Sequence, residues 1–229
     1  MTDNIWQILK KYRLSVIAGL AAVTYNNWLL GPLLNHNLFA HNGSVSEYSV
    51  SSQPSHWWFQ SLDIVSGILL MAVGYKLIQG LKANRAGRFL AIGLVVLGIA
   101  NIWDALFSLP CSETLSRSCS IPVSLNPSNI QLPGHAYSSV VIGVCYLLLP
   151  AAALVYGWRH KLKAVLVLSF LLVSSSLISL ASAIHEYAHA GALTTKTTGG
   201  GQEIQMLLVG AWLIICLLAL DSQRQAGHY

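Results

Sequence analysis

Runs of apolar residues, each long enough to cross a hydrocarbon core of about 30 Å, recur along this chain. Six of them lie near 14–34, 57–78, 89–109, 136–157, 164–184 and 204–220. Backbone polar groups cannot stay unpaired in lipid, so each run predicts a helix rather than an open strand. The pattern therefore predicts an all-α, polytopic membrane protein in which residues 1–229 form a single bundle of six transmembrane helices. Composition agrees, since hydrophobic residues make up 54% of the chain and charged residues 9%, and the mean hydropathy is +0.57.

Lysine and arginine are distributed unequally between the polar connections. Eleven of the thirteen fall on one side of the predicted membrane: Lys10, Lys11, Arg13, Lys76, Lys82, Arg85, Arg88, Arg159, Lys161, Lys163 and Arg224. By the positive-inside rule, both termini are cytoplasmic in a plasma (inner) membrane, and the connections 35–56, 110–135 and 185–203 are extracytoplasmic. The formal net charge of +5 is then a signal of topology and of contact with anionic lipid. We expect no nucleic-acid partner.

Two cysteines lie in the second extracytoplasmic connection. Cys111 and Cys119 would face an oxidising environment there and would close a short loop. We therefore expect a structural disulfide that holds the segment 110–133 over this side of the bundle. Cys145 and Cys216 lie inside apolar runs and are expected to be small core residues.

Histidines concentrate on the same side of the predicted membrane. Six of the eight are expected there: His36, His41, His56, His135, His185 and His189. The segment 185–189 reads His-Glu-Tyr-Ala-His, which places two imidazoles one helical turn apart, the spacing at which a helix presents both to one metal ion. This side of the protein therefore holds most of the potential metal ligands.

Polar residues inside the apolar runs share single helix faces. The faces are His56, Gln60, Asp63 and Gly67; then Asn101, Asp104 and Ser108; then His135 and Ser139; then Ser182, His185 and His189. An ionisable residue within a membrane is costly and indicates a function. We expect these four helices to converge on one shallow polar pocket near the extracytoplasmic surface.

The predicted pocket has the ingredients of a zinc site. His185 and His189 would supply two ligands, with His135 as the preferred third ligand and His56 as the next choice. Asp104 or Asp63 would ligate the metal, orient a histidine, or accept a proton from metal-bound water. Glu186 takes the general-base position of the H-E-x-x-H pattern.

Simpler interpretations compete with this one. Asp63 and Asp104 can serve only as hydrogen-bond partners between helices. His56 precedes Trp57 and Trp58, a group that is also typical of an aromatic belt at the membrane surface. A helix end at that surface can also carry solvated His and Glu without a metal.

Two resemblances add expectations. The stretches 49–59 and 63–67, the segment from Asp104 to Cys111, and His135 at the start of the fourth run resemble a family of six-helix prokaryotic membrane proteins of unknown function. That likeness covers about 14–157 and implies a fold but no activity.

The second resemblance is to the alkaline ceramidase and adiponectin-receptor superfamily of seven-helix zinc proteins. Its Ser-x-x-x-His element is matched by the segment 52–56, its aspartate by Asp104, and its His-x-x-x-His pair by His185 and His189. The resemblance implies zinc-dependent hydrolysis of a lipid amide or ester. This chain departs from it in having six runs, the pair on the fifth, and Pro54 within the first element.

Three functional hypotheses follow. The first is an extracytoplasmic metal-dependent hydrolase that acts on membrane lipid. The second is a sensor, transporter or assembly factor that binds a proton, an ion or a small ligand without catalysis. The third is an intramembrane metalloprotease that depends on Glu186. Neither the substrate nor the oligomeric state follows from the sequence.

Overall fold

The computed structural model describes residues 13–80, 85–116, 118–119, 124–126, 129–131, 134–190 and 199–225. Its elements are α2 (Arg13–Tyr25), η1 (Asn27–Leu30), α3 (Gly31–Leu34), α4 (His36–Ala40), η2 (Val45–Ser49), α5 (His56–Gly80), α6 (Arg85–Leu106), β1 (Ser124–Asn126), β2 (Asn129–Gln131), α7 (Gly134–Arg159), α8 (Lys163–Ala190) and α9 (Gly199–Gln225). Apart from the short antiparallel hairpin of β1 and β2, the regular secondary structure of the described residues is helical. The predicted fold class is confirmed.

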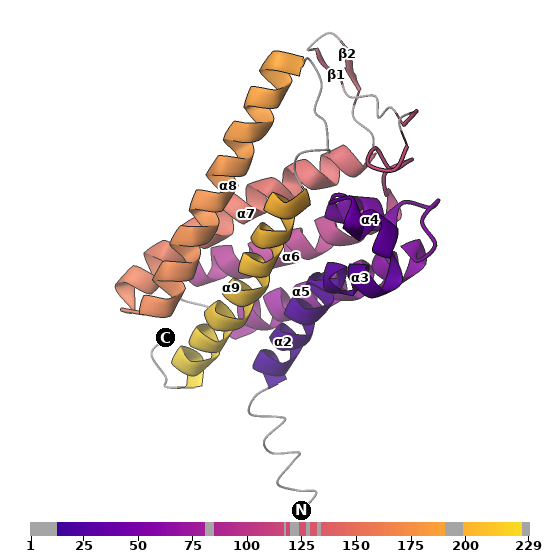
Figure 1. Cartoon of the computed structure of the whole chain (residues 1–229). Coiled ribbons are helices and arrows are strands. Elements are labelled where there is room, and N and C mark those ends of the chain that lie inside the picture. Colours follow the sequence, from indigo (N-terminus) through magenta and orange to yellow (C-terminus); the bar gives the residue numbers. More distant parts are fainter. Residues whose placement is uncertain are drawn as a thin grey trace, which may run out of the picture.

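The long helices form a closed ring in chain order. Each of α5, α6, α7 and α8 contacts the next long helix, α2 contacts α5, and α9 returns to contact α2 (Figure 1). Helix α9 ends at the same end of the bundle at which α2 begins, opposite to the end that carries α3, α4 and the hairpin (Figure 1). We call these the terminal end and the loop end.

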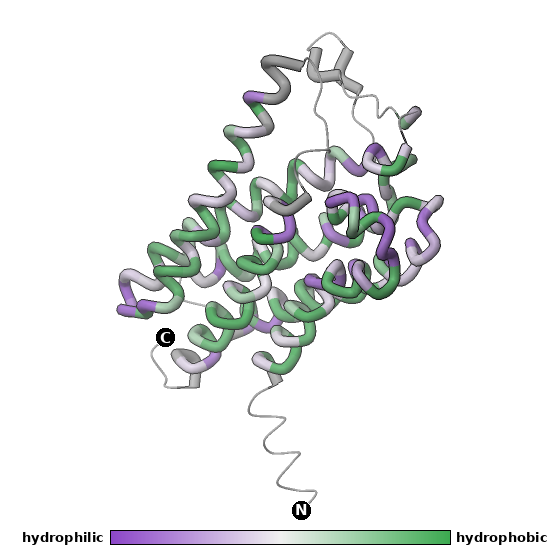
Figure 2. Tube along the Cα trace, in the orientation of Figure 1, coloured by the Kyte–Doolittle hydropathy of each residue, from purple (hydrophilic) through white to green (hydrophobic). Residues whose placement is uncertain are grey.

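Membrane-spanning character is clear in the described residues. Five helices are long and apolar enough to cross a membrane alone, and the bent pair Leu14–Tyr25 and Asn27–Leu34 makes a sixth candidate. Figure 2 shows hydrophobic residues along the long helices and hydrophilic residues gathered around α3 and α4. Exposed aromatic side chains lie at both ends: Trp57, Trp58, Trp103, Phe107 and Tyr137 at the loop end, and Tyr75, Phe89 and Trp158 at the terminal end. Such belts are typical of the two membrane surfaces.

Two boundaries differ from the predicted ones. The first span is not a continuous helix over 14–34, because it bends by 52° between Tyr25 and Asn27. The Asn26 side chain donates to the Ala22 carbonyl, and Pro32 lacks the N–H that a continuous helix needs. The predicted connection 185–203 is also shorter, because α8 runs to Ala190 and α9 begins at Gly199.

Close helix contacts use glycine. A Cβ on Gly67 would lie 2.6 Å from the Gly98 carbonyl oxygen, and a Cβ on Gly98 would lie 2.5 Å from that of Gly67. The backbones of α5 and α6 therefore meet directly, as small residues allow within membranes. These two glycines thus serve helix packing inside one chain.

Helix α7 carries a proline that shapes its contact with α8. Pro150 has no N–H, so the carbonyl of Tyr146, four residues earlier, lacks its usual helical donor. The Ser176 hydroxyl of α8 donates to that carbonyl at 3.1 Å, and Gln205 of α9 donates to Ser176 at 3.0 Å. Side-chain hydrogen bonds that replace the missing backbone bond thereby join α7, α8 and α9.

Candidate functional site

The most distinctive polar cluster at the loop end joins α6 to α7. The Ser138 hydroxyl donates to Oδ1 of Asp104 at 2.5 Å, and Nδ1 of His135 lies 2.9 Å from the same oxygen. The side chain of Asp104 is 23% exposed and that of His135 is 12% exposed. His135 and Ser138 are three residues apart, so both lie on the face of α7 that meets α6. We call these three residues the Asp104 cluster.

The imidazole of His135 lies close to the Asp104 carboxylate but makes no well-aligned hydrogen bond to it. Its buried Nδ1 has no aligned partner within the described residues, although Asp104 is close. The start of α7 is fixed by the indole N–H of Trp103, which donates to the Gly134 carbonyl at 3.2 Å. A carboxylate beside an imidazole can orient the ring or exchange a proton with it. The Asp104 cluster therefore brings a carboxylate, an imidazole and a hydroxyl into contact.

An apolar groove lies next to the Asp104 cluster, between α6 and α7. Its volume is about 200 Å³, and its lining is Val96, Ile99, Ala100, Trp103, Tyr137, Ser138 and Val141. Several of these side chains are apolar and exposed, and they belong to membrane-spanning helices. Exposed apolar side chains on such helices face hydrocarbon. Ser138 belongs to the lining, but it is buried and its hydroxyl bonds to Asp104, so the cluster lies behind an apolar groove surface.

A second carboxylate lies deeper, where α5 meets the bent first span. Asn27 donates its side-chain amide to Oδ1 of Asp63 at 2.6 Å, and the Ser49 hydroxyl also bonds to this carboxylate. Asn101 of α6 donates to the Asp63 backbone carbonyl at 2.8 Å. Asp63 therefore connects three parts of the fold, as the simpler interpretation of this residue expects. Asp63 and Asp104 lie within electrostatic range of each other and of the paired hydroxyls of Tyr25 and Tyr146.

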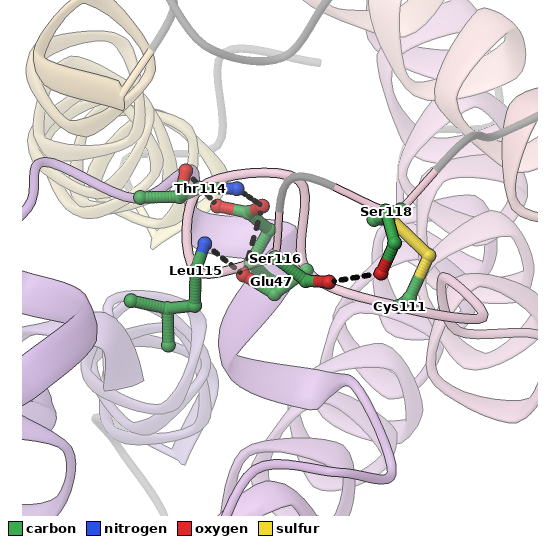
Figure 3. Close-up of a disulfide and its surroundings, with 8 residues drawn as sticks. Glu47, Cys111, Thr114, Leu115, Ser116 and Ser118 are labelled. Atoms are coloured by element: carbon green, nitrogen blue, oxygen red, sulfur yellow. Dashed lines mark hydrogen bonds between the residues drawn. A yellow bond between two sulfur atoms is a disulfide. The ribbon is translucent and has the colours of Figure 1, made fainter.

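A third carboxylate, Glu47, holds the loop end together. Its side chain is part of a fully buried residue and accepts hydrogen bonds from the Ser44 and Thr114 backbone N–H groups at 2.9 Å each. The hydroxyls of Thr114 and Ser112 donate to it at 2.7 and 3.1 Å. Figure 3 shows this arrangement beside the disulfide. We call Glu47 and its donors the Glu47 cradle.

The predicted disulfide is present. Cys111 and Cys119 are bonded, with their Cα atoms 5.8 Å apart, and both cradle donors of this loop lie between them (Figure 3). The disulfide therefore closes the loop that encloses Glu47. Cys145 and Cys216 are buried free thiols, as expected.

The predicted metal ligands are placed as follows. His135 lies beside Asp104, whereas His185 is exposed on the last turns of α8. Nδ1 of His56 lies 2.9 Å from the Gln53 carbonyl, in the turn that begins α5. Within the described residues, no three His, Cys, Asp or Glu side chains lie close enough to hold a metal ion. The side chains of Glu186 and His189 lie outside the described part of the structure.

The structure corrects one predicted contact in this region and adds polar residues that the sequence did not predict. Ser139 was expected to share the face of His135, but it is exposed and donates back to the His135 carbonyl, and Ser138 contacts Asp104 instead. Glu47 was missed as well, although Ser44 three residues before it is the pattern of a helix capping box. The pairing of Tyr25 with Tyr146 was missed because the two residues lie 121 positions apart.

Fold and site together define a polytopic helical membrane protein with a polar cluster beside an apolar groove. The chain belongs to the family described as Protein of unknown function (DUF998), whose model matches residues 16–219. No curated protein and no solved structure matches the chain.

Proposed function

We propose that this protein binds a membrane lipid on its extracytoplasmic side, with an acyl chain in the groove between α6 and α7 and the polar part of the lipid at the Asp104 cluster. The observation that carries the proposal is Ser138, which lines the apolar groove and bonds to the carboxylate. The groove spans two turns of α6 from Val96 to Trp103, about 10 Å along the helix axis. It therefore accommodates part of one acyl chain.

The position of the groove supports this assignment. It ends at the aromatic belt of the loop end, where lipid headgroups meet the hydrocarbon core. Polar and charged groups at that depth can meet the ester and headgroup region of a lipid. The unequal distribution of lysine and arginine supports an extracytoplasmic loop end.

A tryptophan placed at the groove rim tests the proposal. Ile99 is exposed in the groove, so Ile99→Trp fills it, whereas Ile92→Trp places the same side chain two turns away on the same helix. Native mass spectrometry of the purified protein should show bound phospholipid in the wild type and in the Ile92→Trp variant. The Ile99→Trp variant should lose most of it. Equal lipid retention in both variants would contradict the proposal.

Zinc-dependent hydrolysis of the bound lipid stays a prediction. The pair of His135 and Asp104 offers two donors, which is a partial ligand set, and the described residues do not complete it. Metal analysis of the wild type beside a His185→Ala/His189→Ala variant tests the prediction. Stoichiometric zinc that disappears in a folded variant would support it, and a metal-free wild type purified without chelator would contradict it. The metalloprotease hypothesis depends on Glu186 and likewise stays a prediction.

A further inference from the structure

Two aromatic rings, Trp103 and Tyr137, line the loop end of the groove, and a third, Phe107, stacks on Trp103. Trp103 and Phe107 of α6 stack with ring centroids 4.6 Å apart, and both are about half exposed. Tyr137 of α7 lines the same groove as Trp103 and is also exposed. The bond from the Trp103 indole to Gly134 fixes its ring against the start of α7. The groove therefore ends between aromatic faces contributed by two helices.

The charge beside these rings is negative. Ser138 and His135 both contact Oδ1 of Asp104, and a carboxylate has further acceptor capacity. Neither lysine nor arginine occurs in the sequence from 89 to 116 or from 134 to 158. Within the described residues, α6 and α7 offer a lipid phosphate no lysine or arginine at the loop end, whereas they offer an ammonium group both a carboxylate and aromatic faces. Aromatic faces attract ammonium groups, most strongly where water is excluded.

We propose that the loop end of this groove selects lipids whose headgroup carries an ammonium group, such as phosphatidylethanolamine or phosphatidylcholine. This inference rests on the proposed function, because it concerns the headgroup of the lipid whose acyl chain occupies the groove. Trp103, Tyr137 and Asp104 are the residues that recognise the ammonium group.

An ordinary aromatic belt is the competing explanation for these rings, and the chain offers a matched control for it. Trp57 is exposed to a similar extent at the same end of the bundle, where it stacks on Trp58, but it does not line the groove. A belt residue anchors the protein without selecting a headgroup. Trp57→Leu and Trp103→Leu therefore separate the two explanations.

The test measures binding of four dioleoyl lipids to the detergent-purified full chain by native mass spectrometry titration. They are phosphatidylethanolamine, phosphatidylcholine, phosphatidylglycerol and diacylglycerol. The two ammonium lipids should bind about tenfold more tightly than the other two, which is the range of one desolvated cation–π contact. Asp104→Asn and Trp103→Leu should each reduce this preference, and Trp57→Leu should leave it unchanged.

Each outcome bears on one of the two proposals. Equal affinity for all four lipids, with Ile99→Trp still abolishing binding, would overturn headgroup selection and leave the lipid site intact. Preference for phosphatidylglycerol would overturn the inference as well. Unchanged lipid binding in Ile99→Trp would overturn the proposed function itself. If Trp103→Leu fails to fold, the four-lipid comparison on the wild type and on Asp104→Asn still decides the question.

Discussion

Glu47 and Asp104 both carry carboxylates at the loop end, but they differ in burial and in hydrogen-bond partners. Glu47 is 0% exposed and accepts from four donors that carry no charge. Asp104 is 23% exposed, contacts the imidazole of His135, and lies beside the groove between α6 and α7. The hydrogen bonds of Glu47 therefore hold two loops together, whereas Asp104 keeps exposed surface at which a ligand can bind.

This contrast explains how the same end of the bundle can be both rigid and open. The cradle ties η2 to the disulfide loop, so the segments over the bundle are fixed relative to one another. The cluster joins two neighbouring helices beside the apolar groove. Variants of the cradle should therefore act on stability, and variants of the cluster should act on lipid binding.

Removal of Glu47 should have the largest effect. Glu47→Ala leaves buried N–H and hydroxyl donors unpaired, and each unpaired buried donor costs about 1–3 kcal/mol. We expect the free energy of unfolding to fall by about 3 kcal/mol or more. Unfolding in mixed micelles, followed by circular dichroism, measures it, with Ser52→Ala at an exposed loop position as the control. A loss below 1 kcal/mol would contradict the structural role of the cradle.

Removal of the disulfide should have the next largest effect. Cys111 and Cys119 are separated by 8 positions, and closing a loop of that length is worth about 2–3 kcal/mol in the chain-entropy model. The Cys111→Ser/Cys119→Ser variant should lose that amount, and combined with Glu47→Ala it should lose less than the sum. Strict additivity would show that the disulfide and the cradle act independently.

Tyr48 offers a smaller effect of opposite sign. Its hydroxyl is buried without a hydrogen-bond partner among the described residues, so Tyr48→Phe should raise the free energy of unfolding by about 1 kcal/mol. Burial, together with Glu203 and Glu47, raises the pKa of Tyr48 to about 12, against about 10 in an unfolded chain.

The pH dependence of Tyr48 follows from that shift. The ionisation of Tyr48 does not affect stability below pH 10, and the free energy of unfolding falls as the pH rises from about 10 through about 12, because the unfolded chain releases the proton first. Wild type should therefore lose more stability than Tyr48→Phe over this interval. Parallel pH profiles of the two proteins would count against the burial of this hydroxyl.

Asp104→Asn should change stability least. The asparagine oxygen can still accept from Ser138, so we expect a change of about 1 kcal/mol or less in the free energy of unfolding. Binding of lipids that carry an ammonium group should nevertheless weaken. A large loss of stability with unchanged lipid selectivity would reverse the assignment of Asp104 and would make it resemble Glu47.

Much of the fold was predictable because lipid imposes strong rules on sequence. The apolar runs and the cysteine pair each follow from one local constraint, and the structure contains both. The bend at Asn26 was not predicted, because its cause combines a side chain that bonds to its own helix with a proline six residues later.

The site was less predictable than the fold. Helix periodicity placed Asp104 and His135 on faces that could meet, and they do meet. It could not distinguish Ser138 from Ser139, because a small rotation of α7 decides which hydroxyl faces α6. The buried state of Glu47 depends on its hydrogen bonds to Ser112 and Thr114, which come 65 and 67 positions later in the chain. No local pattern encodes such contacts.

The most direct test of the account is to map where a lipid contacts the protein. A phosphatidylethanolamine with a diazirine in one acyl chain is photolysed with the purified protein, and the labelled residues are identified by peptide mass spectrometry. We predict that labelling concentrates on Val96, Ile99 and Val141 and is displaced by excess unlabelled phosphatidylethanolamine. Labelling spread evenly over the exposed apolar residues of all the spans, without displacement, would contradict a specific lipid site between α6 and α7.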